Sequence, residues 1–306
     1  MKKKEVISNA SIHSFSKRAD FFFNIVVALL AFSCILPFFF IIAISVTDES
    51  RLIVDGFQFW PKQFSSAGYE FLQKLQGPIL QSLFITFFIT IVGTLTNVFM
   101  TTTYAYAISR STFKYRRFFT LFALFSMLFS AGMVPTYIVM TSLLGLGDTV
   151  LALILPLMLS PFNIIVMRTF IKRTISESII ESARIDGASE ARIFFQICLP
   201  LVLPGIATIG LFTALAYWND WFNAMLYIKS DNLVPLQYML VKIQQNMEFL
   251  AKSAGAATQT AGLAQNLPKE SARMAMVVVA TLPIACLYPF FQRYFVKGLT
   301  IGGVKE

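Results

Sequence analysis

One polar stretch lies between two long apolar runs of this chain and reads Glu181-Ser182-Ala183-Arg184-Ile185-Asp186-Gly187-Ala188-Ser189. The segment Ile197-Cys198-Leu199-Pro200 follows it and leads into the next apolar run. Hydrophobic residues make up 56% of the 306 residues and charged residues only 13%, whereas about a quarter of the residues of a soluble domain are charged. We therefore expect a membrane protein in which this polar stretch faces the cytoplasm.

The apolar runs predict the fold class, an all-α integral membrane protein with six transmembrane helices. A helix of about 20 residues crosses the roughly 30 Å of hydrocarbon and satisfies its own backbone hydrogen bonds there. The runs that are long enough are residues 21–46, 82–107, 118–144, 149–170, 199–227 and 274–295. Residues 82–297 would then form a core that holds the second to sixth helices, with external loops at residues 47–81 and 228–271.

The Lys and Arg residues predict the orientation of these helices. If the N-terminal segment, residues 1–20, lies in the cytoplasm, most of the 25 Lys and Arg residues fall on the inner side, as the positive-inside rule requires. The tail, residues 298–306, is then cytoplasmic as well. Because the basic residues are spread over separate segments, the net charge of +9 does not indicate a nucleic-acid partner.

Two connections between the predicted spans have a readable pattern. The turn Gly145-Leu146-Gly147-Asp148 is so short that the third and fourth helices must be antiparallel neighbours. The loop at residues 228–271 has apolar residues at the spacing of one helical face, and a flexible stretch from Ala254 to Ala264 follows. Those apolar residues are Leu236, Met239, Leu240, Ile243, Met247 and Leu250. The helix they predict could cap the bundle or bind a partner.

The chain lacks the groups with which it could drive transport by itself. No Asp, Glu, Lys or Arg falls near the middle of a predicted span, where ion-coupled transporters carry such groups. Its one histidine is His13, and it has no phosphate-binding G-x-x-x-x-G-K-[ST] loop. A secondary transporter and a membrane-embedded enzyme are therefore disfavoured, and the energy must come through contact with another protein.

Three cysteines in or beside apolar runs are expected to be buried small hydrophobes instead of metal ligands: Cys34, Cys198 and Cys286.

The polar stretch itself predicts a helix, a sharp bend and a second helix. Thr174 and Glu177 have the spacing of a capping box, which would start the first helix, with Ile175, Ile179 and Ala183 as its apolar stripe. Gly187 suits a left-handed helix end. Ser189 can cap a second short helix that runs into Phe194 and Phe195. By this pattern alone, the stretch could be an ordinary interfacial helix or a contact site for a partner.

The order of motifs resembles the EAA loop of type I ABC importer permeases. The matching segments are Glu181-Ser182-Ala183, Asp186-Gly187-Ala188 and Ile197-Cys198-Leu199-Pro200, within residues 174–200. Further segments resemble the sugar-importer branch, and most closely the maltose-type second permease: Met133-Val134-Pro135, Leu144-Gly145-Leu146-Gly147-Asp148-Thr149, Trp218-Asn219 and Gly298-Leu299-Thr300-Ile301-Gly302-Gly303-Val304-Lys305. The chain departs from the family in having Ser182 for the usual second Ala and in lacking a proline around Thr174 to Ser178.

This resemblance implies a permease subunit of a bacterial plasma-membrane importer that moves a sugar, an oligosaccharide, by alternating access. Another solute, such as a peptide or phosphate, is the alternative. The implied partners are a second permease, two ATP-binding subunits and an extracytoplasmic binding protein; ATP and Mg²⁺ belong to the ATPases, and this chain holds no cofactor or metal and is not an enzyme. The residues implied for coupling to the ATPase are Glu181, Ser182, Ala183, Asp186, Gly187 and Ala188, with Gly298, Thr300 and Gly302 of the tail as a second contact.

A substrate pathway is expected where polar and flat aromatic side chains meet in the spans. A sugar offers an apolar ring face and many hydroxyls, which suits aromatic, amide and carboxylate partners. The candidates are Thr90, Asn97, Asn163, Trp218, Asn219 and Asp220. Each has a simpler interpretation: a polar stripe that packs helices together in the second span, a satisfied kink at Asn163, and an interfacial aromatic belt for the Trp residues, above all Trp221.

Overall fold

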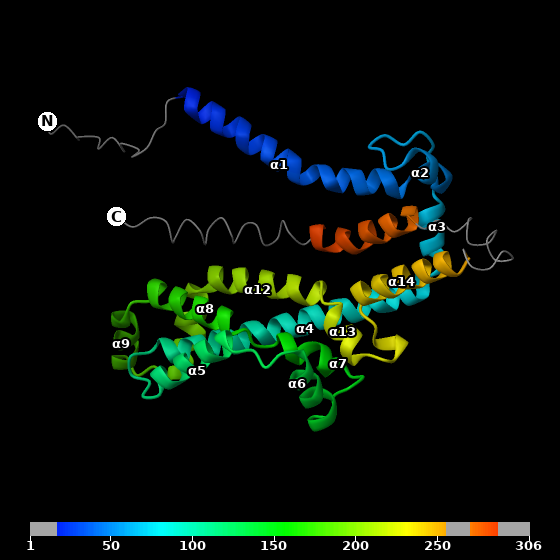
Figure 1. Ribbon diagram of the computed structural model, residues 1–306. Helices are drawn as coiled ribbons and strands as arrows, with labels where there is room; N and C mark the ends of the chain where they lie inside the picture. The colour runs from blue at the N-terminus through cyan, green and yellow to red at the C-terminus, as the bar shows by residue number, and fades with distance from the viewer. Residues whose placement is uncertain (1–16, 255–269, 287–306) are drawn as a thin grey trace. The chain divides into compact units, whose positions relative to one another are not determined.

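The computed structural model describes residues 17–254 and 270–286 (Figure 1). Several predictions fall outside these residues: most of the N-terminal segment, the flexible stretch beyond Ala254, the last part of the sixth predicted span, and the tail with Gly298, Thr300 and Gly302. Contacts divide the chain into two units. One unit holds Met1–Tyr69 and Pro268–Ala275, and the other holds Glu70–Leu267 and Met276–Glu306.

Helices form both units. In chain order they are α1 (Lys17–Ser45), α2 (Glu49–Asp55), α3 (Ala67–Lys74), α4 (Gln76–Ser109), α5 (Arg116–Leu128), α6 (Met133–Ile138), η1 (Val139–Leu143), α7 (Val150–Ile154), η2 (Leu155–Leu157), α8 (Pro161–Thr174), α9 (Glu177–Ile185), α10 (Glu190–Arg192), η3 (Ile193–Cys198), α11 (Leu199–Leu201), α12 (Leu203–Trp218), α13 (Phe222–Tyr227), η4 (Asp231–Leu233) and α14 (Leu236–Ala254). A further helix covers residues 270–286. In the described part of the chain, β structure is limited to one isolated bridge between Thr47 and Phe64. The prediction of an all-α protein is confirmed for these residues.

The first unit is built on α1, which is apolar on every face. Most of its large side chains are exposed on the isolated chain, as expected of a helix whose surroundings are lipid. The loop after it is tied to the helix at residues 270–286. The Glu49 carboxylate accepts hydrogen bonds from the backbone N–H groups of Glu270 and Ser271 at 3.0 and 3.1 Å and from the Ser271 hydroxyl at 3.0 Å.

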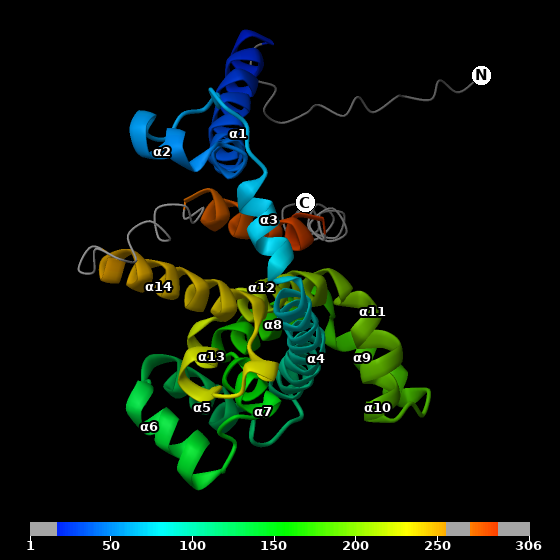
Figure 2. The same cartoon turned by 90° about the vertical axis from the view of Figure 1, so that its right-hand side faces the viewer.

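The second unit is organised around α4, the long helix that Figures 1 and 2 show among its neighbours. It packs against α12 and α8, and also against α5, α7 and α14. The polar stripe predicted on this helix is buried at these contacts: Ser82, Thr86, Thr90, Gly93, Asn97 and Thr101. Burial of small and polar side chains between helices is a common means of helix association in membranes.

Two buried side chains fasten α4 to its neighbours. The Asn97 amide donates to the Leu157 carbonyl at 2.9 Å and accepts from the Thr213 hydroxyl at 3.1 Å. The Tyr217 hydroxyl donates to the Ile154 carbonyl at 2.7 Å, and its ring lies directly over Gly93, so closely that a Cβ there would overlap it. Helices α4, α7, η2 and α12 are therefore joined by hydrogen bonds as well as by packing.

Three of the predicted spans are bent, which the apolar runs did not reveal. Helices α5 and α6–η1 meet at 113°, α7–η2 and α8 at 50°, and the helical segments Glu190–Leu201 and Leu203–Trp218 at 77°. The prediction of one unbroken helix at 118–144 is wrong, because α5 ends at Leu128 and a new helix, α6, begins after Gly132, its N-cap, which has a φ of 82°. The short helix predicted from Ser189 extends to Leu201, and the fifth predicted span continues after the bend as α12, which begins at Leu203 instead of residue 199 and ends at Trp218 instead of residue 227. Among the described residues, two single helices are long and apolar enough to cross a membrane. If each bent pair is counted as one span, there are up to five.

The turn between the third and fourth predicted spans is held by Asp148. Its carboxylate accepts hydrogen bonds from the backbone N–H groups of Lys229 and Ser230, each at 2.9 Å, and from the Ser230 hydroxyl. That hydroxyl, followed by the two N–H groups, holds the pKa of Asp148 below its ordinary value. Helix α5 packs against α8, so the third and fourth predicted spans are neighbours, as the short turn predicted.

The remaining expectations about loops and cysteines have mixed outcomes. The amphipathic helix predicted after residue 228 is confirmed as α14, and its first residue, Leu236, donates its backbone N–H to the Thr86 hydroxyl at 2.8 Å. Cys198 is buried, whereas Cys34 and Cys286 are exposed. The prediction of burial is wrong for these two on the isolated chain. For Cys34 the reason is that α1 is apolar all round, so membership of an apolar run did not specify a face that packs within the protein.

We expect Gly93→Ala to destabilise the second unit by about 1–3 kcal/mol, because the new methyl group overlaps the Tyr217 ring in a packed interface. Gly210→Ala is the matched control in α12: a Cβ there meets Val98 at 3.6 Å, which is ordinary contact, and alanine favours helix over glycine by up to about 1 kcal/mol. Thermal unfolding of the purified protein in detergent measures both. Equal stability of the two variants would contradict the close contact between α4 and α12.

Candidate functional site

The predicted coupling loop is a short helix followed by a turn and a second helix, but its start differs from the prediction. Helix α8 continues to Thr174, and Ser176 is the N-cap of α9, without a side-chain capping bond. The capping box predicted from Thr174 is therefore wrong, because that residue still belongs to the preceding helix. The predicted stripe is wrong at one position: Ile175 and Ala183 are buried as predicted, but Ile179 is 42% exposed, and Ile180, at 3%, is buried in its place.

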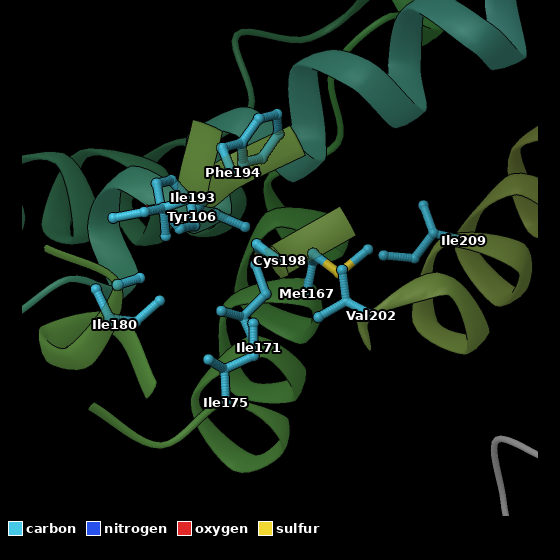
Figure 3. Packing of buried hydrophobic residues seen from close by; sticks show 12 residues of the cluster. Tyr106, Met167, Ile171, Ile175, Ile180, Ile193, Phe194, Cys198, Val202 and Ile209 are labelled. Atoms are coloured by element: carbon cyan, nitrogen blue, oxygen red, sulfur yellow. The ribbon is translucent and has the colours of Figure 1, made fainter. Parts of the chain in front are cut away.

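An apolar cluster holds this loop against the C-terminal ends of α4 and α8 (Figure 3). From the loop come Ile180 and Ala183, and from the linker before it Ile175. They pack with residues of the neighbouring helices: Ala105, Tyr106, Met167, Ile171, Ile193, Phe194, Cys198, Val202 and Ile209. Full burial of one such isoleucine is worth about 1.5–3 kcal/mol, so the buried face of α9 anchors the loop firmly.

Gly187 ends α9 by the geometry expected from its position. Its φ is +78°, its N–H donates to the Arg184 carbonyl at 3.0 Å, and the Ala188 N–H donates to the Ala183 carbonyl at 2.9 Å. This pair of bonds is the Schellman motif. The Ser189 hydroxyl then accepts from the Arg192 N–H at 3.3 Å. The predicted left-handed turn and the predicted Ser189 cap are both confirmed.

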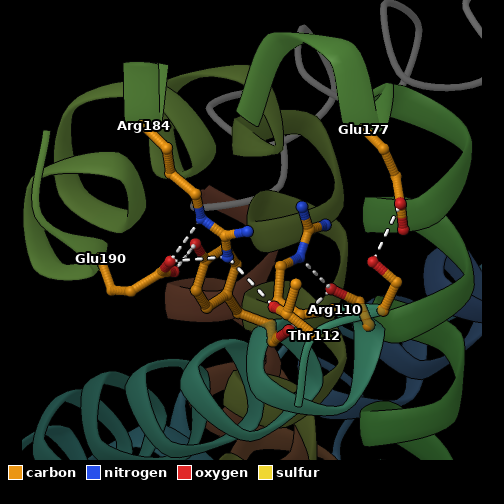
Figure 4. A network of polar contacts seen from close by, with 8 residues as sticks. Arg110, Thr112, Glu177, Arg184 and Glu190 are labelled. Carbon is orange, nitrogen blue, oxygen red and sulfur yellow. Dashed lines mark hydrogen bonds and ion pairs between the residues drawn. The ribbon is translucent and has the colours of Figure 1, made fainter. Parts of the chain in front are cut away.

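A polar network ties the same loop to the end of α4 (Figure 4). The Glu190 carboxylate accepts from the Arg184 guanidinium at 2.6 Å and from the buried Tyr106 hydroxyl at 3.1 Å. Arg184 also donates to the Thr112 hydroxyl at 3.1 Å. The sequence did not single out this network, because Tyr106 and Glu190 are 84 positions apart and no local pattern relates them.

The outer face of the loop is exposed and carries polar and apolar groups together. Glu181, Ser182, Asp186 and Gly187 are all exposed, and Ile185 is 87% exposed. Of the residues predicted for coupling, Ala183 is instead buried and Ala188 is partly buried, and both pack toward the cluster. The structure therefore brings the predicted coupling residues together, with some of them as anchors and the rest as a free surface. Ile185 belongs to that surface, and its helical position next to polar Asp186 could have identified it from the sequence.

The predicted pathway residues are dispersed over the second unit. Asn97 and Thr90 are buried within α4 contacts, and Asn163 is partly buried near the start of α8. Trp218 is 2% exposed, and its indole N–H donates to the Ala280 carbonyl at 3.2 Å. Asn219 is exposed and donates to the Leu215 carbonyl at 2.9 Å.

Asp220 adjoins them and accepts from the side chain of Asn223 at 2.7 Å. The assignment of these residues to a substrate path stays a prediction. Among the residues that the structure describes, no group of three or more His, Cys, Asp or Glu could hold a metal ion.

Comparison with known proteins identifies the family. Residues 100–301 match the family described as "Binding-protein-dependent transport system inner membrane component". Protein LplC of Bacillus subtilis is 42% identical over 89% of this chain and 89% of its own length. The polygalacturonan/rhamnogalacturonan transport system permease protein YtcP of the same species is 37% identical over 90% of this chain and 94% of its own.

A solved structure has the same fold. It belongs to a bacterial ABC transporter involved in the import of the acidic polysaccharide alginate, and it superposes with a TM-score of 0.76 at 29% identity over 92% of this chain and 100% of that chain. The family match covers the loop, its anchoring cluster and most of the helices that hold it. The chain belongs to the inner membrane components of binding-protein-dependent transport systems, and it is a permease subunit of an ABC importer.

Proposed function

We propose that the loop at residues 174–200 receives the movement of an ATPase subunit and passes it to the transmembrane helices. The observation that carries this proposal is the division of the loop into two faces. Ile180 and Ala183 anchor one face in the apolar cluster, while Glu181, Ile185 and Asp186 present the other to the surroundings. The anchored face would pass to the helices any movement that a partner imposes on the exposed face.

The rest of the transporter follows from the family. Such importers consist of two permeases, two ATP-binding subunits and an extracytoplasmic binding protein, so we infer the same partners for this chain, with ATP and Mg²⁺ held by the ATPases. We further infer six spans in the plasma membrane, with the helix at residues 270–286 as part of the last, and both termini in the cytoplasm. Rocking of the helices between inward- and outward-facing states would carry the substrate. The tail residues Gly298, Thr300 and Gly302 are proposed as a second ATPase contact.

The substrate we propose is an oligosaccharide. Support comes from similar proteins, since YtcP is named for polygalacturonan and rhamnogalacturonan and the solved transporter takes part in alginate import. Alternative solutes, such as peptides or phosphate, have no comparable support. Within this chain, the proposed pathway residues are Thr90, Asn97, Asn163, Trp218, Asn219 and Asp220.

Gly187→Pro is expected to uncouple ATP hydrolysis from uptake. Proline fixes φ near −65° and has no N–H, so it can neither adopt the φ of +78° nor donate to the Arg184 carbonyl. Gly187→Asn is the control, since asparagine tolerates the left-handed region and keeps the N–H. ATP turnover and substrate uptake by the reconstituted transporter are measured together. Unimpaired uptake in the proline variant would refute the coupling role of the loop.

Tyr106→Phe is expected to loosen the loop without unfolding the protein. The ring stays in the cluster, but the bond to Glu190 is lost, at a cost of about 0.5–1.5 kcal/mol. Backbone hydrogen exchange in α9 and α10 should become faster. Tyr104→Phe is the matched control on the same helix, because the Tyr104 hydroxyl bonds the Phe119 carbonyl at 3.0 Å and does not touch the loop. Unchanged exchange in the Tyr106 variant would show that the hydrogen bond does not hold the loop.

Uptake by the complete transporter in proteoliposomes tests the substrate class. We expect uptake of oligosaccharides that needs ATP and the binding protein and persists when ionophores remove ion gradients. Oligogalacturonides and neutral oligosaccharides of the same length should be compared directly, with a peptide and phosphate as controls. Uptake driven by an ion gradient without ATP, or uptake of the peptide or phosphate in place of saccharides, would overturn the proposal.

A further inference from the structure

Arg110 is a buried cation at the point where α4 ends. Arg110 as a whole is 6% exposed. Its Nε donates to the Ser109 hydroxyl at 3.1 Å, and its guanidinium carbon lies 5.0 Å from the centre of the Tyr106 ring. These contacts hold the stem of the side chain and one of its nitrogens. They leave its positive charge without a negative partner.

The carboxylates around Arg110 are engaged elsewhere or stand apart from it. Glu190 pairs with Arg184, and Glu177 accepts from the Ser111 hydroxyl at 2.9 Å. Figure 4 shows the Arg110 guanidinium between the side chains of Arg184 and Glu177. Among residues 17–254 and 270–286, no carboxylate lies within ion-pair distance of it. A buried charge without a partner is costly, so a protein that retains one gains from a partner that arrives later.

A small surface hollow gives such a partner access to Arg110. The hollow is lined by Arg110, Ser111 and Thr112 and by four residues of α9, namely Glu177, Ile180, Glu181 and Arg184. The hollow therefore adjoins the exposed face of the coupling loop. A group that binds to that face would also lie beside the unpaired guanidinium.

We propose that this hollow receives an acidic side chain of the ATPase subunit, whose carboxylate pairs with Arg110. The inference rests on the proposed function, because it requires the ATPase to bind at the loop at residues 174–200. Charge complementarity selects the occupant: a guanidinium offers paired N–H donors that match the two oxygens of a carboxylate. Glu181, which lines the same hollow, makes no ion pair with another residue of the described part of the chain, so the partner segment would present a cation to Glu181 and an anion to Arg110.

Arg110→Met separates this role from a structural one. Methionine replaces a buried, unpaired charge with an apolar side chain, and such replacements are often neutral or stabilising. In membranes that contain the full chain without ATPase subunits, we expect unfolding temperatures equal to or above that of the original protein. Binding of the ATPase should be about tenfold or more weaker, as when one partner of a buried charge pair is removed. Arg117→Gln, at an exposed cation on α5, is the control and should bind normally.

The other results are each decisive. Normal ATPase binding by Arg110→Met would overturn the pairing, and if Gly187→Pro still uncouples transport, the proposed function survives that failure. A fall in stability without the ATPase larger than the loss of the Ser109 hydrogen bond and the Tyr106 contact explains would place the partner of Arg110 inside the chain, which also overturns the proposal. Repeating that measurement with Glu181→Gln, and with the tail after residue 297 removed, would then identify the internal partner. Arg110→Lys should retain part of the binding, with a stronger dependence on salt.

Discussion

The amide of Asn97 is the interaction on which the second unit depends most. Its two ends reach two different elements, the Leu157 carbonyl in η2 and the Thr213 hydroxyl in α12. No water is available inside a bilayer to replace these bonds, and each is worth about 0.6–2 kcal/mol. Because the carbonyl of Leu157 lies at a bend of the fourth predicted span, the bond also satisfies a backbone group that the bend exposes. The second unit can therefore contain this bend without leaving the carbonyl of Leu157 unpaired.

The coupling loop follows the same principle at the membrane surface. One face contributes isoleucine and alanine to a cluster shared with α4 and α8, and Glu190 accepts hydrogen bonds from Tyr106 and Arg184. The loop is thus fixed to the helices by two independent sets of contacts, one apolar and one polar. The exposed Glu181, Ile185 and Asp186 contribute little to that attachment. Contact with a partner and attachment to the helices are assigned to different residues.

The sequence predicted the parts of this site that depend on local chemistry. Gly187 ends α9 and Ser189 starts the next helix because a left-handed glycine and a capping hydroxyl act over a few residues. The prediction failed at Thr174, since only the packing of α8 determines how far that helix continues. It could not identify Arg110 and Tyr106 as neighbours of the loop, because tertiary contact alone brings them there. The break between α5 and α6 was likewise hidden, since an apolar run has the same composition whether it is straight or broken.

The bend at Val202 has a mechanical consequence. The segment Glu190–Leu201 begins at the Ser189 cap inside the loop and is helical to its end, and it meets Leu203–Trp218 at 77°. Two rigid helical segments joined at nearly a right angle change the direction of a movement that passes from one to the other. A displacement along the first arm becomes a sideways displacement of the second, and α12 is the arm that carries Thr213 and Tyr217 against α4.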